Sequence, residues 1–526
     1  MRSATHTTNR VKKETGLRYW MLRVPEECDK VLKDFDSDPV HDLRVALRRC
    51  RSLADGLKAL DPEPAWKDMK KAGKRLFQRL GELRDTQVMM EWVQKFGPAS
   101  AQGSEQMSEE TDRGGNEASG ADQHAPEAQS LLEILKVREK EQKLDAQAAV
   151  EEFDQKQWRN WSKTLPRRAL RIRPGSPLFK HLALERWTEA RELHARALRN
   201  RSQVALHSLR IGIKNFRYIV ENFLPVEHKA WSGDLKEMQD LLGEVHDLDV
   251  LWNTAVKCRV FPDAESRNQW HQRILAERSK RIEQYRSRMV GENSLWPIWR
   301  AALPQGRQVQ ALATRCMKLW ARELDPDFAH SERVTKLALQ LYDGLLRWGW
   351  EPAIETTSAR ASLFAAGLLH DVGKSEGQKQ HQKASLDLIR GHGSPLGWNG
   401  DDLQRAAIVA RFHCGALPTR RHKKLCGLLP DEQKATIQLA AVLRLANALD
   451  ATHDGHIREL QVMDIHSRKN GFERNARRAA MDPILVIAAQ GYRTAGPAAR
   501  TIAAERHLLE IVLRRPVVVR PARRRA

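Results

Sequence analysis

Residues 207–218 read HSLRIGIKNFRY, and this stretch holds four histidine or basic side chains at helical spacing. They are His207, Arg210, Lys214 and Arg217, separated by three, four and three residues. At roughly 100° per residue in an α-helix, these side chains fall within about 80° of one another, on one face. Taken alone, such a stripe is typical of a solvated helix surface.

The same pattern occurs earlier in the chain, in HDLRVALRRCR at residues 41–51. A second block follows each copy, because LGELRDTQV at 80–88 matches LGEVHDLDV at 242–250. Two blocks in the same order, 162 to 166 residues apart, indicate an internal duplication, and we expect an approximate two-fold relation between two helical halves. The duplicated stripe comprises His41, Arg44, Arg48 and Arg51 in the first copy and His207, Arg210, Lys214 and Arg217 in the second.

The charge of the chain points to an anionic partner. The 526 residues include 89 Lys and Arg against 67 Asp and Glu, a formal net charge of +22. This balance favours nucleic acid, an anionic membrane surface or polyphosphate. Two stripes brought together around one groove would repel each other unless an anion lay between them. Because Arg and Lys donate several hydrogen bonds to phosphate oxygens, a linear polyphosphate suits such a groove.

Several classes of protein are disfavoured. No helix-turn-helix, RNP, KH or zinc-finger pattern and no aromatic ladder accompanies the charge, so nucleic acid is the weaker candidate partner, although nonspecific binding to it stays open. The six cysteines include no CxxC pair, which indicates neither a zinc knuckle nor a disulfide framework. No apolar signal core and no run of about eighteen apolar residues occurs. We therefore expect a cytoplasmic protein with reduced thiols and no membrane partner.

The pattern of hydrophobic residues predicts a mainly α protein. The first three hundred residues show helical periodicity, interrupted at about 97–130 by a Gly, Ser, Glu and Gln rich segment that we expect to be a disordered insertion. A Pro/Gly break at 301–308 is the main expected domain boundary. Near the end, HIRELQVMDI, PILVIAAQGY and RRPVVVRP predict short strands beside a helix, and hence a small α+β element.

The paired HxLR and LGxxxDxxV blocks resemble the CHAD family, the conserved-histidine α-helical domain, over roughly residues 10–300. This resemblance implies a helical bundle of two pseudo-symmetric halves whose basic faces bind inorganic polyphosphate. It makes all eight residues of the duplicated stripe candidate phosphate contacts. Weaker candidates, placed only by nearness to the motif, are Arg49, Lys74, Arg75, Arg79, Arg84 and His246.

The second part of the chain holds a histidine-aspartate motif, LFAAGLLHDVGK at 363–374. The adjacent His370 and Asp371 can present an imidazole and a carboxylate to one divalent metal ion. Together with His330 and LRLANALD at 443–450, this order resembles the HD phosphohydrolase superfamily. More narrowly, residues 308–520 are similar to the C-terminal HD domain of the exopolyphosphatase and guanosine pentaphosphate phosphohydrolase family.

The HD resemblance implies a divalent metal site, for Mn²⁺, Mg²⁺ or a similar ion, with His330, His370 and Asp371 as ligands. The last ligand of most HD enzymes is the Asp of a Leu-Ala-Asp triplet, whereas this chain has Asn447 there and Asp450 one turn later. Either side chain can supply the fourth ligand, because residues i and i+3 share a helix face. The expected catalytic residues are Asp371 and Lys374, and the second-shell or second-metal candidates are His381 and His413.

Two functions follow from these expectations. In the first, the CHAD part binds polyphosphate and the HD part hydrolyses polyphosphate or a phosphorylated nucleotide. In the second, the HD part is degenerate and the protein only binds polyphosphate or is targeted to polyphosphate granules. The departure at Asn447 favours the second, and the set of His330, His370, Asp371 and Lys374 favours the first. The sequence does not indicate the oligomeric state.

Overall fold

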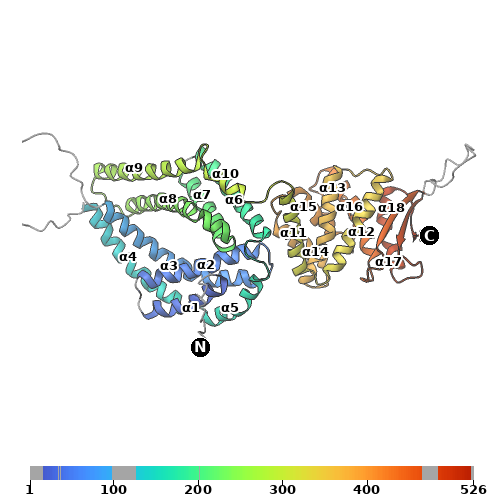
Figure 1. The fold of residues 1–526 in the computed structure, drawn as a ribbon, viewed down its shortest axis with the longest axis horizontal. Helices are drawn as coiled ribbons and strands as arrows, with labels where there is room; N and C mark the ends of the chain where they lie inside the picture. Colours follow the sequence, from blue (N-terminus) through green and yellow to red (C-terminus); the bar gives the residue numbers. More distant parts are fainter. Residues whose placement is uncertain are drawn as a thin grey trace, which may run out of the picture. The chain divides into compact units, whose positions relative to one another are not determined.

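The computed structural model describes residues 16–33, 35, 37–96, 126–200, 202–464 and 484–522. The chain divides into two compact units, Met1–Gln305 and Gly306–Ala526 (Figure 1). The described residues are mainly α-helical, as the sequence predicts, and the only described sheet is a small one in the second unit.

The first unit contains two sets of helices in matching order. The first set is α1 (Leu17–Lys33), α2 (Ser37–Lys58), α3 (Ala65–Phe96), α4 (Pro126–Glu151) and α5 (Gln155–Ala169), and the second is α6 (Pro177–Arg199), α7 (Gln203–Phe223), α8 (Pro225–Lys257), α9 (Ala264–Met289) and α10 (Leu295–Ala301). The stripe lies on α2 and again on α7, and the LGE block lies on α3 and again on α8. Equivalent helices pack on one another, α2 on α7 and α3 on α8. The duplicated sequence blocks therefore come together at the contact between the two sets.

Helix α7 shows why the stripe is displayed at a surface. The Ser202 side chain caps the helix by accepting a hydrogen bond from the Ala205 amide. The opposite face is buried at helical spacing, through Leu206, Leu209, Ile213, Phe216 and Val220. Burial of this apolar face leaves the four stripe residues on the remaining, partly exposed side.

The second unit is an α-helical body with a three-stranded sheet. Its helices are α11 (Arg307–Leu324), α12 (Phe328–Arg347), α13 (Thr356–Leu369), the 3₁₀ turn η1 (Val372–Ser375), α14 (His381–His392), α15 (Gly400–Arg411), α16 (Pro430–Leu449), α17 (Ala498–Glu505) and α18 (His507–Leu513). Strand β2 (Leu485–Gln490) pairs antiparallel with β1 (Glu459–Asp464) and parallel with β3 (Val517–Pro521). This is the small α+β element predicted from the sequence.

Three other predictions concern the insertion, the cysteines and the membrane-spanning segments. Residues 97–125 of the expected insertion lie outside the described residues, and Pro126 already begins α4. All six cysteines are described, and none of them forms a disulfide. Among the described helices, none combines the length and the hydropathy needed to span a bilayer.

Candidate functional site

The two stripes face each other in the first unit. Burial lowers the pKa of Lys214 on α7, and the neighbouring cations Arg210, Arg48 and Arg51 lower it further. Arg48 and Arg51 belong to α2, so cations of both copies act on one ammonium group. The stripes of the two halves thus form one basic surface.

A cavity of about 420 Å³ opens on this surface, between α2, α7 and α8. Of the predicted phosphate contacts, His41, Arg48 and Arg217 line it. Lys236 of α8 also lines it, although the sequence reasoning did not name this residue. The repeat could have found it, because Lys236 lies 162 residues after Lys74. The remaining lining residues are Arg49, Tyr218, Glu221, Gln239 and Asp240.

The stripe residues differ from the basic residues around them in their ion pairs with carboxylates. None of the eight stripe residues forms an ion pair with a carboxylate in the described part of the chain. Nearby arginines do: Arg49 lies 2.5 Å from Glu221, Arg79 2.8 Å from Glu82 and Arg84 3.1 Å from Glu91, and Arg75 pairs with Glu152. The stripe residues therefore lack the direct carboxylate contacts that neutralise these neighbouring arginines, which favours contact with an anion from outside the chain.

The arginine of each HxLR motif also lies against the LGE block of its own half. Arg44 donates hydrogen bonds of 3.0 Å to the carbonyl oxygens of Leu80 and Gly81. A Cβ atom at Gly81 would lie 3.7 Å from the Arg44 guanidinium, and one at Gly243 would lie 4.0 Å from Arg210. The arginine of each HxLR motif thus packs against the glycine of its LGE block, which accounts for the joint repetition of the two blocks.

Titratable groups lie beside Arg210. His207 and His246 approach to 3.3 Å between their Nδ1 atoms. Burial and the nearby cations Arg210 and Lys214 lower the pKa of both imidazoles, that of His246 to about 4. Burial raises the pKa of Asp247 to about 6, although Arg210 opposes the shift. The two imidazoles are therefore neutral at pH 7.

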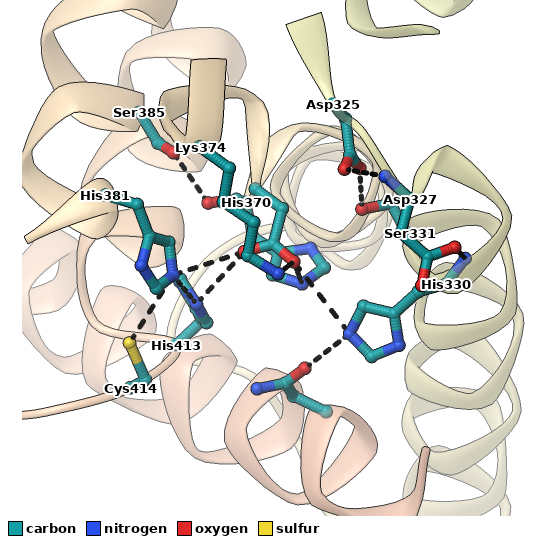
Figure 2. Close-up of polar contacts among 12 residues, drawn as sticks. Asp325, Asp327, His330, Ser331, His370, Lys374, His381, Ser385, His413 and Cys414 are labelled. Carbon is teal, nitrogen blue, oxygen red and sulfur yellow. Dashed lines mark hydrogen bonds and ion pairs between the residues drawn. The ribbon is translucent and has the colours of Figure 1, made fainter. Parts of the chain in front are cut away.

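In the second unit, His330, His370 and Asp371 form a buried group whose ligand atoms lie within 4.8 Å of one another. Oδ2 of Asp371 lies 3.3 Å from Nε2 of His370 and 3.9 Å from Nε2 of His330. His330 comes from the first turn of α12, which Asp327 caps, and His370 follows the end of α13. Figure 2 shows His330 and His370 with the polar residues around them.

The two candidates for the fourth ligand have different partners. Asp450 accepts hydrogen bonds from His330 Nδ1 at 2.7 Å, from Arg333 at 2.9 Å and from the Gly455 amide at 3.2 Å. Asn447 places its Oδ1 3.0 Å from His330 Nε2, on the side of the ring that faces Asp371. Asp450 therefore orients the imidazole, and Asn447 lies beside its other nitrogen.

One inner atom of this group lacks a hydrogen bond. His370 donates from Nδ1 to the Gly367 carbonyl at 2.8 Å, so its Nε2 carries the lone pair. In the described part of the chain, this Nε2 is buried without a hydrogen-bond partner and faces Asp371 Oδ2 at 3.3 Å. Buried polar atoms are seldom left unsatisfied, and a cation between the imidazole and the carboxylate would satisfy this nitrogen. The donor set of two imidazoles, a carboxylate and an amide oxygen fits a divalent metal ion.

Lys374 and Gly373 complete this region. Lys374 donates from Nζ to Asp371 Oδ2 at 2.5 Å. A Cβ atom at Gly373 would lie 2.1 Å from the His381 carbonyl oxygen and 2.4 Å from the Ser385 amide. Only glycine allows η1 to approach the start of α14 this closely, and the approach brings His381 toward Asp371.

A second group lies on the other side of Asp371. His381 Nε2 is 3.1 Å from His413 Nε2 and 3.9 Å from Cys414 Sγ, and Figure 2 shows the three side chains turned toward one another. Asp371 Oδ1 lies 3.2 Å from His381 Nε2 and 3.6 Å from His413 Nε2. Although burial disfavours ionisation of Asp371, His370 and His381 hold its pKa well below the usual range. The Asp371 carboxylate thus lies between two groups of candidate metal ligands.

Comparison with known proteins identifies both parts of the chain. Residues 23–255 match the family model of the CHAD domain, and residues 314–477 match that of the Ppx/GppA phosphatase, domain III. A crystal structure of the CHAD domain from the plant Ricinus communis is similar with 17% identity and a TM-score of 0.37, over 55% of this chain and 90% of that chain. No curated protein matches the sequence. The family models confirm the resemblance to the CHAD family and the resemblance to the exopolyphosphatase and guanosine pentaphosphate phosphohydrolase family: the chain joins a CHAD domain to a Ppx/GppA phosphatase domain III.

Proposed function

We propose that this protein binds inorganic polyphosphate through its CHAD domain and hydrolyses a phosphate ester or anhydride in its second unit. The substrate class for the second unit is polyphosphate or a phosphorylated nucleotide. The observation that carries the hydrolytic part is the buried group of His330, His370 and Asp371, whose ligand atoms lie within 4.8 Å of one another and in which His370 Nε2 has no hydrogen-bond partner among the described residues.

The binding part rests on the stripe residues and the cavity. His41, Arg48 and Arg217 line the cavity without a carboxylate partner in the described part of the chain, and Lys236 adds a further ammonium group. Arginine donates to phosphate oxygens in bidentate fashion, and several cations along one groove match the repeated charges of a linear polyphosphate. The partner proposed for this surface is therefore polyphosphate, and the cavity is the proposed binding site for a segment of the polyphosphate.

The metal ligands proposed for the second unit are His330, His370, Asp371 and Asn447. Asp450 is proposed to orient His330, because its oxygens already accept hydrogen bonds from His330, Arg333 and the Gly455 amide. Carboxylates in this role fix the ring and increase the basicity of the nitrogen that binds the metal. Asn447 provides a neutral oxygen where a carboxylate would add charge.

A bound divalent ion would polarise a phosphoryl oxygen and lower the pKa of a water molecule. Lys374 holds Asp371 in position through its hydrogen bond of 2.5 Å. Its ammonium group can also neutralise a phosphoryl oxygen that approaches Asp371. The side chains of His330, His370 and Asp371 are at most 2% exposed, so they are shielded from bulk water. These residues favour phosphoryl transfer to water within a preorganised polar site.

The second candidate function is binding without catalysis. The observation that favours it is the neutral Asn447, together with the Lys374 ammonium group on the metal-facing Asp371 oxygen. Both reduce the attraction of the site for a cation. In this case the protein would bind polyphosphate, or associate with polyphosphate granules, and the second unit would serve as a folded partner.

Two measurements on the full chain test the proposal. Metal content is determined after purification, and phosphate release is assayed on polyphosphate and on guanosine penta- and tetraphosphate with added Mn²⁺. We expect bound metal and turnover that His370→Ala and Asp371→Asn abolish. Absence of both metal and turnover in the native chain would leave the binding function alone.

Polyphosphate affinity is measured at fixed salt in a parallel experiment. The double variant Arg48→Glu with Arg217→Glu reverses two cavity charges, and Arg159→Glu with Lys163→Glu makes the same change of charge on the exposed face of α5. We expect the first pair to lower the affinity at least about tenfold, or roughly 1.4 kcal/mol, and the second pair to have a small effect. Equal losses in both would show a nonspecific charge effect and contradict the cavity as the binding site.

A further inference from the structure

We propose that His207 and His246 form a phosphate subsite that becomes charged when polyphosphate binds: the pair takes up a proton together with the anion, and binding strengthens as the pH falls. This inference rests on the proposed function, because it concerns the same basic surface. It goes further in naming the groups that regulate binding, and it follows from a difference between the two copies of the repeat.

The two LGE blocks differ at one basic position. Arg84 of the first block is matched by His246 of the second. Arg84 is a permanent cation that lies 3.1 Å from Glu91. His246 instead approaches His207, the histidine of the second stripe, to 3.3 Å between the Nδ1 atoms, with the ring centroids 4.7 Å apart. The second copy therefore has a titratable pair where the first copy has a fixed charge.

The contact between the two imidazoles limits the number of protons that they hold. Two Nδ1 atoms at 3.3 Å share a hydrogen bond only if one ring donates and the other accepts. The donating ring then has a free Nε2, which can take up a proton while the hydrogen bond is kept. Protonation of the second ring as well would place two N–H groups against each other. The pair therefore accepts about one additional proton.

The cations beside the pair oppose its protonation while no anion is bound. Burial, Arg210, His207 and Lys214 together lower the pKa of His246 to about 4. Burial, Arg210 and Lys214 also lower the pKa of His207. A phosphate group beside these cations would offset their repulsion of a further positive charge and raise both pKa values. Binding of the anion and binding of the proton should therefore favour each other.

Other charged groups lie around the pair and the cations beside it. They are Arg48 and Arg51 of α2, Arg84 and Asp85 of α3, and Glu244 and Asp247 of α8, with Arg281 of α9 paired to Glu244. Helix α6 meets α7 through apolar side chains, as at Ala190 and Leu193. Asp247 has a pKa raised to about 6, mainly by burial, so this carboxyl also exchanges protons near that pH. A test of the imidazoles must therefore include a variant of Asp247.

Calorimetric titration of the full chain with long-chain polyphosphate measures the proton uptake, because the internal phosphates stay ionised between pH 6 and pH 8. Titrations in two buffers of different ionisation enthalpy give the protons taken up per protein molecule at pH 6. His246→Arg gives the second copy the permanent cation of the first. It should lower the uptake by about one proton relative to the native chain. The matched variant His228→Arg, near the start of the same helix, should keep the native uptake.

Two further variants separate the imidazoles from other effects. His207→Gln with His246→Gln removes both imidazoles without adding charge, and it should also lower the uptake by about one proton. Asp247→Asn, introduced into the native chain and into His246→Arg, should leave the difference between these two proteins unchanged, because it removes the titrating carboxyl from both.

The affinity should follow the same linkage. The native chain should bind polyphosphate about tenfold more tightly for each unit of decrease in pH, over the range in which the bound pair is protonated and the free pair is not. His246→Arg should bind more tightly than the native chain at pH 8 and depend less on pH. Absence of polyphosphate binding at both pH 6 and pH 8 would contradict the proposed function itself. Binding without proton uptake by the native chain, or with equal uptake in the native chain and in both histidine variants, would overturn this inference alone.

Discussion

At the scale of single residues, Asn447 and Asp450 have different roles beside the imidazole of His330. Asp450 accepts from His330 Nδ1 at 2.7 Å, and Asn447 Oδ1 lies 3.0 Å from His330 Nε2. The Asn447 oxygen beside His330 Nε2 is therefore neutral, whereas the Asp371 oxygen 3.9 Å from this nitrogen belongs to a carboxylate. The negative charge of the proposed metal site comes from Asp371. A carboxylate at position 447 would add to this charge, so the residue at this position should affect the affinity for the metal.

Asn447→Asp should increase the affinity for a divalent metal by about tenfold or more, or at least about 1.4 kcal/mol, because a second carboxylate would face the cation. Asp450→Asn should decrease it roughly 10- to 100-fold, because His330 would lose its orienting acceptor. Competition with a chelating dye measures both affinities. A larger loss of metal affinity in Asn447→Ala than in Asp450→Asn would agree with these roles. Unchanged metal affinity in Asp450→Asn would contradict them.

Asp247 is the residue for which a pH dependence follows. Its pKa is raised to about 6 from the ordinary value of 3.8, mainly by burial. A raised carboxyl pKa contributes stability that is fully present below pH 3.8 and is lost as the pH rises through about 6. Asp247→Asn should therefore stabilise the first unit at pH 7.5 and change its stability little near pH 4.

The measurement is thermal unfolding of the native chain and the variant at both pH values. Asp61→Asn is a useful control in the same unit: although burial opposes the shift, hydrogen bonds from Arg168 and Trp66 lower the pKa of Asp61, so its replacement should destabilise the unit at pH 7.5. Asp247→Asn should also raise polyphosphate affinity at pH 7.5, since it removes a negative charge beside Arg210. A lower melting temperature of Asp247→Asn at pH 7.5 would refute the assignment.

Whether the sequence could predict each of these features depends on how far apart in the sequence the residues concerned lie. The repeated stripe and the His-Asp dipeptide are local patterns, and both led to residues that the structure brings together. The different partners of Asn447 and Asp450 were left open, because both share a helix face and only the position of His330 separates them. The closeness of Cys414 to His381 depends on the approach of α14 to η1, which no local pattern contains.

At the scale of elements, the contact between α2 and α7 brings the two stripes together. The helices approach closely at Gly56, where a Cβ atom would lie 2.4 Å from the Phe223 ring. Asn222 of α7 also donates to Ser52 of α2 at 2.7 Å. Helical periodicity predicted both helices, and their equivalence followed from the repeat. Their close approach, and the third wall of the cavity on α8, are tertiary features that no local pattern contains.

Gly56→Ala should push α2 away from α7, because the added methyl group overlaps the Phe223 ring. Overpacking of this kind costs about 1–3 kcal/mol, and polyphosphate affinity should fall although no charge changes. Gly233→Ala on α8 is the matched control: no atom lies within 4 Å of its added Cβ. That substitution should stabilise the helix by up to about 1 kcal/mol.

Denaturant unfolding and polyphosphate titration of both variants provide the comparison. If Gly56→Ala unfolds with the native midpoint and binds polyphosphate with native affinity, the contact between α2 and α7 does not set the spacing of the stripes. A loss in Gly233→Ala as large as that in Gly56→Ala would show instead that the first unit tolerates no methyl group on its helices.

At the scale of the whole molecule, each unit has a hydrophobic core of its own. One cluster runs from Met317 to Val519 within the second unit, and another runs from Met89 to Ile274 within the first. The candidate ligand sites follow the same division, because the stripe residues all lie before Gln305 and the candidate metal ligands all lie after Gly306. Each ligand should therefore stabilise the unit that binds it.

This division predicts two thermal transitions with different ligand responses. A ligand at about 100 times its Kd adds about 2.7 kcal/mol to the stability of the state that binds it. Polyphosphate should raise the transition of the first unit, and Zn²⁺ or Mn²⁺ should raise that of the second. Arg48→Glu with Arg217→Glu should abolish only the polyphosphate response, and His370→Ala only the metal response. Calorimetry of the full chain measures both, and a single transition that both ligands raise would mean that the two units unfold together.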